Sequence, residues 1–269
     1  MIASPDVARE ARIALLSPVL IGASGGSGTR VLRDALAAAG FYMGYDTLGT
    51  GDSVELADFF DRQIAPVLAA THRVDYELDQ VPPALRSRVQ LDLEATLASY
   101  LQHHTGGGGA WGLKGPRTLF MLPFFHEQLP DFAFVQMIRD GRDMALSGNQ
   151  GQLRRYHEPL HGETLPPDLA VPAARLWAKA NLEAADWCRH HIAGRHWVLR
   201  YEDLCRDPRA TLRALFDFLG ASFAPDLLER LAGGVKPSAG IGRWRQLDPV
   251  KARAITEAAR PALARFGYS

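Results

Sequence analysis

Residues 18–33 read Pro-Val-Leu-Ile-Gly-Ala-Ser-Gly-Gly-Ser-Gly-Thr-Arg-Val-Leu-Arg, and this stretch decides the fold. Residues 19–21 form a short apolar run, which predicts a buried strand. A glycine-rich turn follows over 22–28, and a helical pattern of apolar residues then runs from 31 to 39 and stops at Gly40. Glycines let backbone N–H groups approach a ligand, and a helix N-terminus favours negative charge. The stretch therefore predicts a site for a phosphate or a sulfate ester.

The donors of this turn suit several anions. A P-loop is excluded because no lysine stands in the turn. The glycine spacing also fits a dinucleotide turn, as in short-chain dehydrogenases, but no tyrosine of the chain has a lysine four residues later. A tight turn that binds nothing is a further alternative. The candidate ligands of the anion are Gly25, Gly26, Ser27, Gly28, Thr29 and Arg30.

The composition is that of an ordinary globular chain. The 269 residues carry 30 basic and 30 acidic side chains, so the formal net charge is zero and an anion site has to be local. The two cysteines give no disulfide framework, no apolar run approaches the ~20 residues that span a bilayer, and no secretory signal is visible. These features predict a cytoplasmic protein with no nucleic-acid partner and no integral membrane segment.

Strand-like and helix-like segments alternate along the chain, which predicts an α/β fold with a central, mainly parallel sheet flanked by helices. We expect one domain over residues 1–269, with a core over about 17–247. The polar segment 148–170 predicts a mobile loop over a site. The other predicted elements are strands at 111–113, 132–138 and 196–201, a loop at 106–109, and helices at 173–193, from Pro208 to Gly220 and at 249–265.

A second group of donors follows the predicted strand at 132–138. Arg139 stands where that strand ends, and Ser147 lies eight residues later, in the first turns of the expected next helix. A guanidinium fork and a hydroxyl suit one phosphate, with Arg142 as a further candidate. The alternative is a surface turn with local ion pairs, but the glycine-rich turn beside it favours anion binding.

At this point the chain resembles the sulfotransferases that use 3′-phosphoadenosine 5′-phosphosulfate (PAPS). Residues 26–30, Gly-Ser-Gly-Thr-Arg, resemble the family's 5′-phosphosulfate loop, and residues 139–147 match its Arg-x-x-Arg-Asp segment with a serine eight residues after the first arginine. Residues 199–204, Leu-Arg-Tyr-Glu-Asp-Leu, followed by Asp207-Pro208, resemble a third family segment. A weaker likeness is Gly-Arg-Trp-Arg at 242–245, near a family segment that touches the nucleotide.

The resemblance implies a P-loop-like fold related to nucleotide kinases, with PAPS as the donor, adenosine 3′,5′-bisphosphate (PAP) as its product, and no metal. It implies that Ser27, Gly28, Thr29 and Arg30 hold the 5′-phosphosulfate. Arg139 and Ser147 would hold the 3′-phosphate, and Tyr201 would lie near the adenine, with a core aromatic as its alternative role. The remaining nucleotide contacts would come from Gly25, Gly26, Arg243 and Trp244.

The chain departs from the family pattern at Gly26, where most members carry a lysine or an arginine. That cation stabilises the charge that develops as the sulfuryl group leaves, and a glycine has none. Lys114 and Arg117 follow the short strand at 111–113 and are the candidates to replace it, with Lys114 preferred. We expect an electrostatic role for this ammonium in the transition state.

The general base is predicted from the acidic residues that follow the first helix. Some family members have a histidine two residues after the matching lysine, but Pro116 stands there in this chain. Glu55 is the first candidate and Asp52 the second, because a desolvated carboxylate can take a hydroxyl proton. The further candidates of this region are Asp46 and Asp58, followed by His72 and His157.

The sequence thus predicts sulfuryl transfer from PAPS to a hydroxyl or an amine of a small-molecule, lipid or carbohydrate acceptor. A protein that binds PAPS or PAP with degraded catalysis is one alternative, and a kinase-like or NAD(P)-dependent enzyme on a related sheet is another. No metal site is expected. His157 and His161 are four residues apart, but Pro159 between them argues against a regular helix.

Overall fold

A computed structural model describes residues 18–45, 47–104 and 109–268. Its strands are β1 (Val19–Ala23), β2 (Gly112–Lys114), β3 (Ala133–Ile138) and β4 (His196–Arg200). Its α-helices are α2 (Arg30–Ala38), α3 (Val54–Thr71), α4 (Pro83–Leu101), α5 (Leu122–Gln128), α6 (Gly141–Ala145), α7 (Gly151–His161), α8 (Ala170–His191), α9 (Tyr201–Arg206), α10 (Pro208–Phe218), α11 (Pro225–Gly234) and α12 (Pro249–Arg265). Its short 3₁₀ turns are η1 (Leu78–Gln80), η2 (Pro116–Phe120) and η3 (Arg243–Gln246).

The four described strands form one parallel sheet in the order β2-β1-β3-β4, which confirms the predicted α/β class. The central strand β1 pairs with β2 on one side and with β3 on the other. Since all strands are parallel, their carboxyl ends lie at the same edge of the sheet. The glycine-rich turn leaves the middle of that edge.

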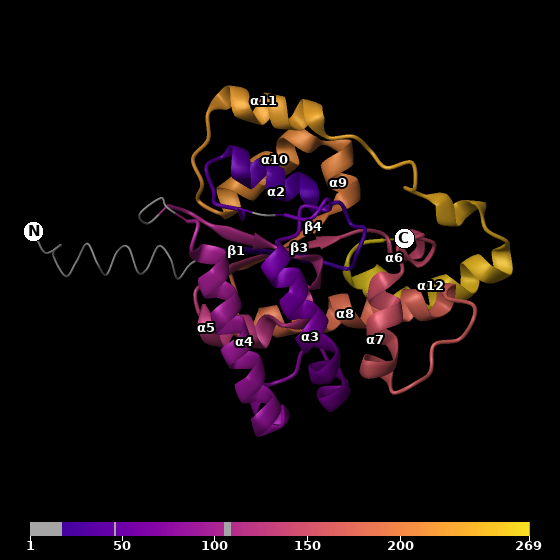
Figure 1. Cartoon of the computed structure of the whole chain (residues 1–269). Helices are drawn as coiled ribbons and strands as arrows, with labels where there is room; N and C mark the ends of the chain where they lie inside the picture. Colours follow the sequence, from indigo (N-terminus) through magenta and orange to yellow (C-terminus); the bar gives the residue numbers. More distant parts are fainter. Residues whose placement is uncertain (1–17, 46, 105–108, 269) are drawn as a thin grey trace, which may run out of the picture.

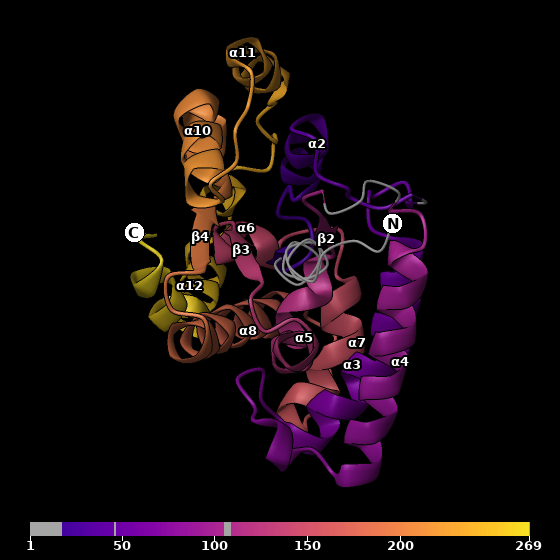
Figure 2. The ribbon, with the colours of Figure 1, turned by 90° about the vertical axis from the view of Figure 1, so that its left-hand side faces the viewer.

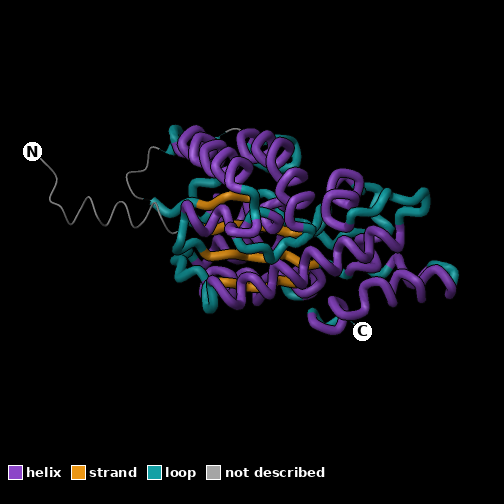
Figure 3. The backbone as a smooth tube through the Cα atoms, turned by 90° about the horizontal axis from the view of Figure 1, so that it is seen from below, coloured by secondary structure: helices purple, strands orange, loops and turns teal. Residues whose placement is uncertain are grey.

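Both faces of the sheet are covered by helices. Along β1, Val19, Ile21 and Ala23 pack with apolar residues of α2, α9, α10 and α11, whereas Leu20 packs with those of α3, α4, α5, α7, α8 and α12. This alternation is the period of two that a strand imposes on its side chains. Figures 1 and 2 show the two helical layers on opposite sides of the strands, and Figure 3 shows helices stacked over the sheet.

Most of the predicted elements are present. The strand at 132–138 is β3, the helix at 173–193 is α8, and the helix at 249–265 is α12 with the same bounds. Asp207 caps α10 by accepting a hydrogen bond from the N–H of Ala210, as its position before Pro208 predicts. The strand at 196–201 ends one residue early, because Tyr201 begins α9. Residues 106–108 of the predicted loop lie outside the described residues.

The expectation of a loop over 148–170 was wrong, because helix α7 fills half of that segment. Its buried residues Leu153, Tyr156, His157 and Leu160 recur at helical spacing, and burying this face outweighs the hydrogen bond that Pro159 removes. His157 and His161 therefore do lie on one regular helix. Among the described residues, no group of three or more histidine, cysteine, aspartate or glutamate side chains is placed to hold a metal.

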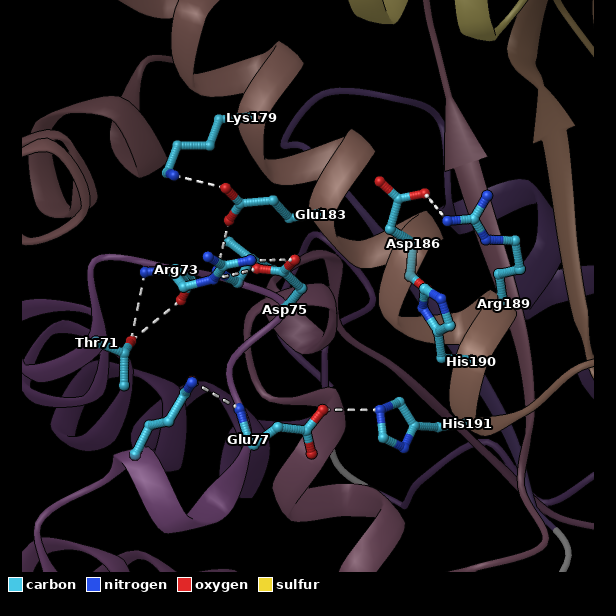
Figure 4. A network of polar contacts seen from close by, with 12 residues as sticks. Thr71, Arg73, Asp75, Glu77, Lys179, Glu183, Asp186, Arg189, His190 and His191 are labelled. Carbon is cyan, nitrogen blue, oxygen red and sulfur yellow. Dashed lines mark hydrogen bonds and ion pairs between the residues drawn. The ribbon is translucent and has the colours of Figure 1, made fainter.

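The segment after α3 is tied to helix α8 by polar contacts. The Glu183 carboxylate accepts hydrogen bonds from Lys179 and from the backbone N–H of Val74, and Glu77 contacts His191 (Figure 4). These contacts join α8 to the segment that connects α3 to α4. The opposite end of α3, its N-terminus, lies toward the glycine-rich turn. No described helix is both long and apolar enough to cross a membrane.

Candidate active site

The glycine-rich turn is shaped for close approach of a ligand. Gly26 and Gly28 have φ values of 81° and 83°, a left-handed conformation that suits glycine. A Cβ atom at Gly28 would lie 2.5 Å from a ring carbon of Tyr201, so only glycine fits there. Within the described residues, the backbone N–H groups of Gly26, Ser27 and Gly28 have no hydrogen-bond partner. The turn thus carries unpaired donors at the N-terminus of α2.

Helix α7 contacts the glycine-rich turn through Gln152. The backbone N–H of Gly25 donates to Gln152 Oε1 over 3.0 Å, although the two residues are 127 positions apart. The Ser27 hydroxyl donates to the Ser24 carbonyl over 2.5 Å. The whole turn, from Ser24 to Arg30, lines a cavity of about 650 Å³. The turn is therefore fixed before any ligand arrives.

Lys114 brings a buried cation into the same cavity from the end of β2. Only 4% of its surface is exposed, and its ammonium donates to the Thr50 carbonyl over 3.0 Å and to the Asp52 carboxylate. Burial lowers the pKa of the Lys114 ammonium, and the adjacent Asp52 carboxylate opposes that shift. Arg30 also donates to the Thr50 carbonyl, over 3.3 Å. The loop at 50–52 thus joins Lys114 to the start of α2.

The two candidate bases lie in different surroundings. Asp52 lines the cavity, accepts from the Thr50 hydroxyl over 2.9 Å and pairs with Lys114. Glu55 accepts from the Ser53 hydroxyl over 2.7 Å at the start of α3, and it is not part of the described cavity lining. Asp46 lies outside the described residues. The structure therefore brings Asp52, rather than Glu55, to Lys114.

Arg117, the second candidate cation, lines the cavity and forms hydrogen bonds that do not involve Lys114. Its guanidinium donates to the Asp61 carboxylate, to the Tyr156 hydroxyl over 3.2 Å and to the Ala57 carbonyl over 3.1 Å. Arg155 of α7 lies 3.4 Å from the same Asp61 carboxylate. Asp61, Arg117 and Arg155 all line the cavity, so its wall between α3 and α7 is charged. No local motif signals Asp61, and the sequence reasoning missed it.

At the end of β3, Arg139 belongs to a second group of polar residues. Its guanidinium lies 5.2 Å from the centre of the Tyr201 ring, and its Nη2 lies 3.5 Å from the Ser238 hydroxyl. The Tyr201 hydroxyl accepts from the backbone N–H of Ser238 over 3.2 Å. The Nε atom of Arg139 is buried and has no partner among the described residues. Ser238 was missed, although the sequence places it just ahead of the Gly-Arg-Trp-Arg segment.

Ser147 lies beside the glycine-rich turn. It follows α6 rather than standing in the first turns of a helix, and its hydroxyl would lie 3.7 Å from a Cβ atom at Gly26. The same hydroxyl accepts from the N–H of Asn149 over 3.2 Å. Neither Ser147 nor Arg139 is part of the described lining of the 650 Å³ cavity. Tyr201 lines that cavity and contacts Arg139, so it links the two groups.

The Gly-Arg-Trp-Arg segment is bound to α6. The Asp143 carboxylate accepts from the backbone N–H groups of Gly242 and Trp244, over 2.6 and 3.1 Å, and Arg243 donates to the Asp143 carbonyl. The centre of the Trp244 ring lies 3.7 Å from the guanidinium carbon of Arg142. Arg142 also forms an ion pair with Asp140. Arg142 and Asp143 thus hold Trp244 against α6.

Comparison with known proteins identifies the family. A profile of the sulfotransferase family matches residues 18–225, and the chain belongs to this family. Human carbohydrate sulfotransferase 3 is 24% identical over 176 residues, which cover 55% of this chain and 36% of the relative. The chain therefore aligns with about a third of the length of that curated relative.

Solved structures share the fold. Sulfotransferase STF9 from Mycobacterium avium superposes with a TM-score of 0.58 at 16% identity, covering 99% of this chain and 87% of that chain. Mouse sulfotransferase SULT7A1, solved as a complex with PAP, superposes with a TM-score of 0.53 at 12% identity, covering 93% and 85%. The single α/β domain with its parallel sheet is therefore the fold of the sulfotransferases.

Proposed function

We propose that the chain transfers a sulfuryl group from PAPS to a hydroxyl or an amine of an acceptor. One observation carries the proposal: the strand order β2-β1-β3 puts a turn of unpaired N–H donors between two strand ends that bear Lys114 and Arg139. Membership of the sulfotransferase family supports it, as does the PAP complex of a structural neighbour.

The residues present fit a nucleotide with phosphates at both ends. Unpaired N–H groups of the turn from Gly26 to Gly28 suit the 5′-phosphosulfate, with Thr29 and Arg30 at the start of α2. The buried Nε of Arg139 has no partner and suits the 3′-phosphate, together with the Ser238 hydroxyl and with Ser147. Tyr201 lies between the two ends and offers its ring to the adenine. Bound PAPS would supply an activated sulfuryl group.

Lys114 is the proposed substitute for the cation that Gly26 cannot provide. Its ammonium is buried, held by two oxygens of the loop at 50–52, and therefore oriented before the reaction. A fixed positive charge in a desolvated site stabilises negative charge that develops on the leaving oxygen. Asp52 keeps the ammonium charged against the cost of burial.

Asp52 is also the better placed of the two candidate bases. It lines the cavity and contacts the Lys114 ammonium, and a carboxylate in this place can accept a proton from the acceptor hydroxyl. Glu55 would act only if its carboxylate left the Ser53 hydroxyl. The pH dependence of the Asp52→Asn and Glu55→Gln variants separates the two: loss of the acidic limb of kcat identifies the base.

The cavity limits the acceptor by class. Its inner wall is apolar, formed by Phe120, Leu153, Leu176 and Trp177, while Asp61, Arg117 and Arg155 make its outer wall charged. This combination suits an acceptor with an apolar part and a polar reacting end, whether a small molecule, a lipid or a carbohydrate. The name of the curated relative favours a carbohydrate. Two free cysteines support the proposed cytoplasmic location.

Thermal denaturation with nucleotides tests the donor site. PAP should raise the melting temperature more than 5′-AMP does, because a ligand that binds only the native state stabilises it. Transfer from radiolabelled PAPS to an acceptor panel then tests catalysis. A PAP shift with no transfer to any acceptor or to water would indicate degraded catalysis. Stabilisation by ATP or NADPH, with none by PAP, would favour the kinase-like or dehydrogenase-like alternative.

A further inference from the structure

Strand β4 leaves one edge of the sheet open. Its only strand neighbour among the described residues is β3, with Phe134 opposite His196 and Gln136 opposite Val198. The N–H of Phe134 donates to the carbonyl of Arg195. In a parallel ladder this register turns the backbone groups of His196 and Val198 away from β3. None of these groups has a backbone partner elsewhere in the described chain, and Figure 2 shows β4 on the outer side of the sheet.

A hollow of about 560 Å³ runs beside this open edge. Alternate residues of β4, His196, Val198 and Arg200, line it on one side. The ends of α8 and α12 line the other side, where Cys188 and Phe266 are buried. A strand added to β4 would direct every second side chain into this hollow. Its apolar lining residues are Ala185, Cys188, Ala193, Val198 and Phe266, and its volume is large enough to hold one such side chain.

The rim of the hollow is positively charged. Arg189, Arg200 and Arg265 line it with one carboxylate, Asp203, which lies 3.8 Å from Arg200, while Asp186 beside the lining pairs with Arg189 over 3.2 Å. Three arginines against two carboxylates leave one net positive charge. Arg265 is exposed and has no ion-pair partner within the described residues. His196 adds no positive charge at neutral pH, because burial lowers its pKa to about 4. The hollow therefore combines apolar lining residues, a basic rim and unpaired backbone groups.

We infer that the β4 edge is a docking site for an extended acidic segment of a partner protein, which adds to the sheet as a fifth strand. The open N–H and carbonyl groups of His196 and Val198 would bind its backbone. An apolar residue would fill the centre of the hollow, and acidic residues two positions to either side would face the arginines. A second copy of this chain fits poorly, since pairing two β4 edges would bring the two sets of arginines together.

A labelled peptide tests this docking site directly. The probe is a fluorescein-tagged peptide of sequence Gly-Glu-Thr-Val-Thr-Glu-Gly, compared with the same peptide carrying Lys in place of both Glu. Fluorescence anisotropy should show binding of the acidic peptide that weakens with salt, and no binding of the lysine peptide. Hydrogen exchange should slow at His196 and Val198 on binding, while Trp197 and Leu199, already bonded to β3, should change little.

Two variants separate the backbone and charge contributions. Val198→Pro removes an outward N–H without breaking a bond to β3, and Arg189→Glu with Arg265→Glu reverses the charge of the rim. The charge reversal should weaken binding of the acidic peptide at least ~10-fold, the loss of one charge-assisted contact, and Val198→Pro should weaken it about 2- to 10-fold, the loss of one backbone hydrogen bond. Arg253→Glu, on an exposed part of α12 away from the hollow, should not weaken it. Should Val198→Pro fail to fold, the exchange pattern of the unchanged protein decides. The inference would be overturned if the lysine peptide bound as well as the acidic peptide, or if the acidic peptide did not bind at millimolar concentration. It would also be overturned if the protein formed a dimer that Val198→Pro abolished.

Discussion

Replacing Lys114 by methionine should separate catalysis from folding. The side chain is 4% exposed, and methionine fills a similar volume without the charge. Removing one donor aimed at the developing charge costs ~10²–10³ in kcat, or ~2.7–4 kcal/mol of transition-state stabilisation. We expect that loss in kcat together with a smaller melting-temperature shift from PAP, because the leaving oxygen that Lys114 is proposed to stabilise becomes an oxygen of the 5′-phosphate of PAP.

The structure also bounds the effect on folding. The methionine variant leaves Asp52 without its ion-pair partner, but that carboxylate is 23% exposed and keeps the Thr50 hydroxyl. A fully buried carboxylate without its partner would cost about 3–5 kcal/mol. Partial hydration of Asp52 reduces this cost, and so does the loss of the desolvation penalty of the Lys114 ammonium. The folding loss should therefore be smaller than the loss in transition-state stabilisation.

The assay is transfer from radiolabelled PAPS, to the best acceptor of the panel or to water, measured with saturating donor over a range of pH. Lys179→Met is the matched control, since Lys179 also pairs with a carboxylate, that of Glu183, but lies away from the cavity. The Lys114→Arg variant should recover part of kcat. Asp52→Asn removes the group that raises the pKa of Lys114, so the high-pH limb of kcat should move to lower pH. A kcat for Lys114→Met equal to that of the parent enzyme would refute the reasoning.

Three more predictions concern the nucleotide site and stability. Gly28→Ala places a methyl group 2.5 Å from the Tyr201 ring and adds roughly 1–2 kcal/mol of left-handed strain, so thermal denaturation should show a lower melting temperature and no PAP shift; an intact shift would contradict the close approach. Arg139→Ala should weaken the binding of PAP by about 1.5–3 kcal/mol per lost charged hydrogen bond and leave the binding of 5′-AMP unchanged, as measured by calorimetry. Equal weakening for both nucleotides would contradict the placement of the 3′-phosphate at Arg139. Burial lowers the pKa of His161 and His196 to about 4, below the usual value of 6.5. The stability that the two neutral histidines contribute is therefore complete above pH 6.5 and is lost as the pH falls from 6.5 toward 4. The slope should reach at most ~1.4 kcal/mol per pH unit for each histidine in urea unfolding, and His196→Gln should reduce it; a flat profile would oppose this.

Sequence reasoning succeeded where a feature depends on neighbours along the chain. The strand, the turn of 22–28 and the start of α2 occupy one continuous stretch, and the glycines of that stretch are required by local backbone geometry. The cap of α10 at Asp207 is likewise local. Helix α7 shows the limit of this reasoning. Pro159 was given too much weight against a buried face whose partners on α3 and α8 are far away in sequence.

The residues that were missed all act through distant contacts. Gln152 reaches Gly25 across 127 positions, Asp61 meets Arg117 across 56, and Ser238 meets Arg139 across 99. None of these pairs has a spacing that periodicity or a motif can reveal. They become visible only when the packing of α7 and of the segment after α11 is known.

The strand order explains why motifs that are separate in the sequence lie at neighbouring strand ends. The sequence predicted that polar residues follow several strands of a parallel sheet, and it did not predict which strands are neighbours. Because β1 lies between β2 and β3, the glycine-rich turn is flanked by the strand ends that carry Lys114 on one side and Arg139 on the other. With β1 at an edge, one of those two cations would lie a further strand spacing away, about 4.8 Å. The central position of β1 is thus the physical condition for a single nucleotide to contact both.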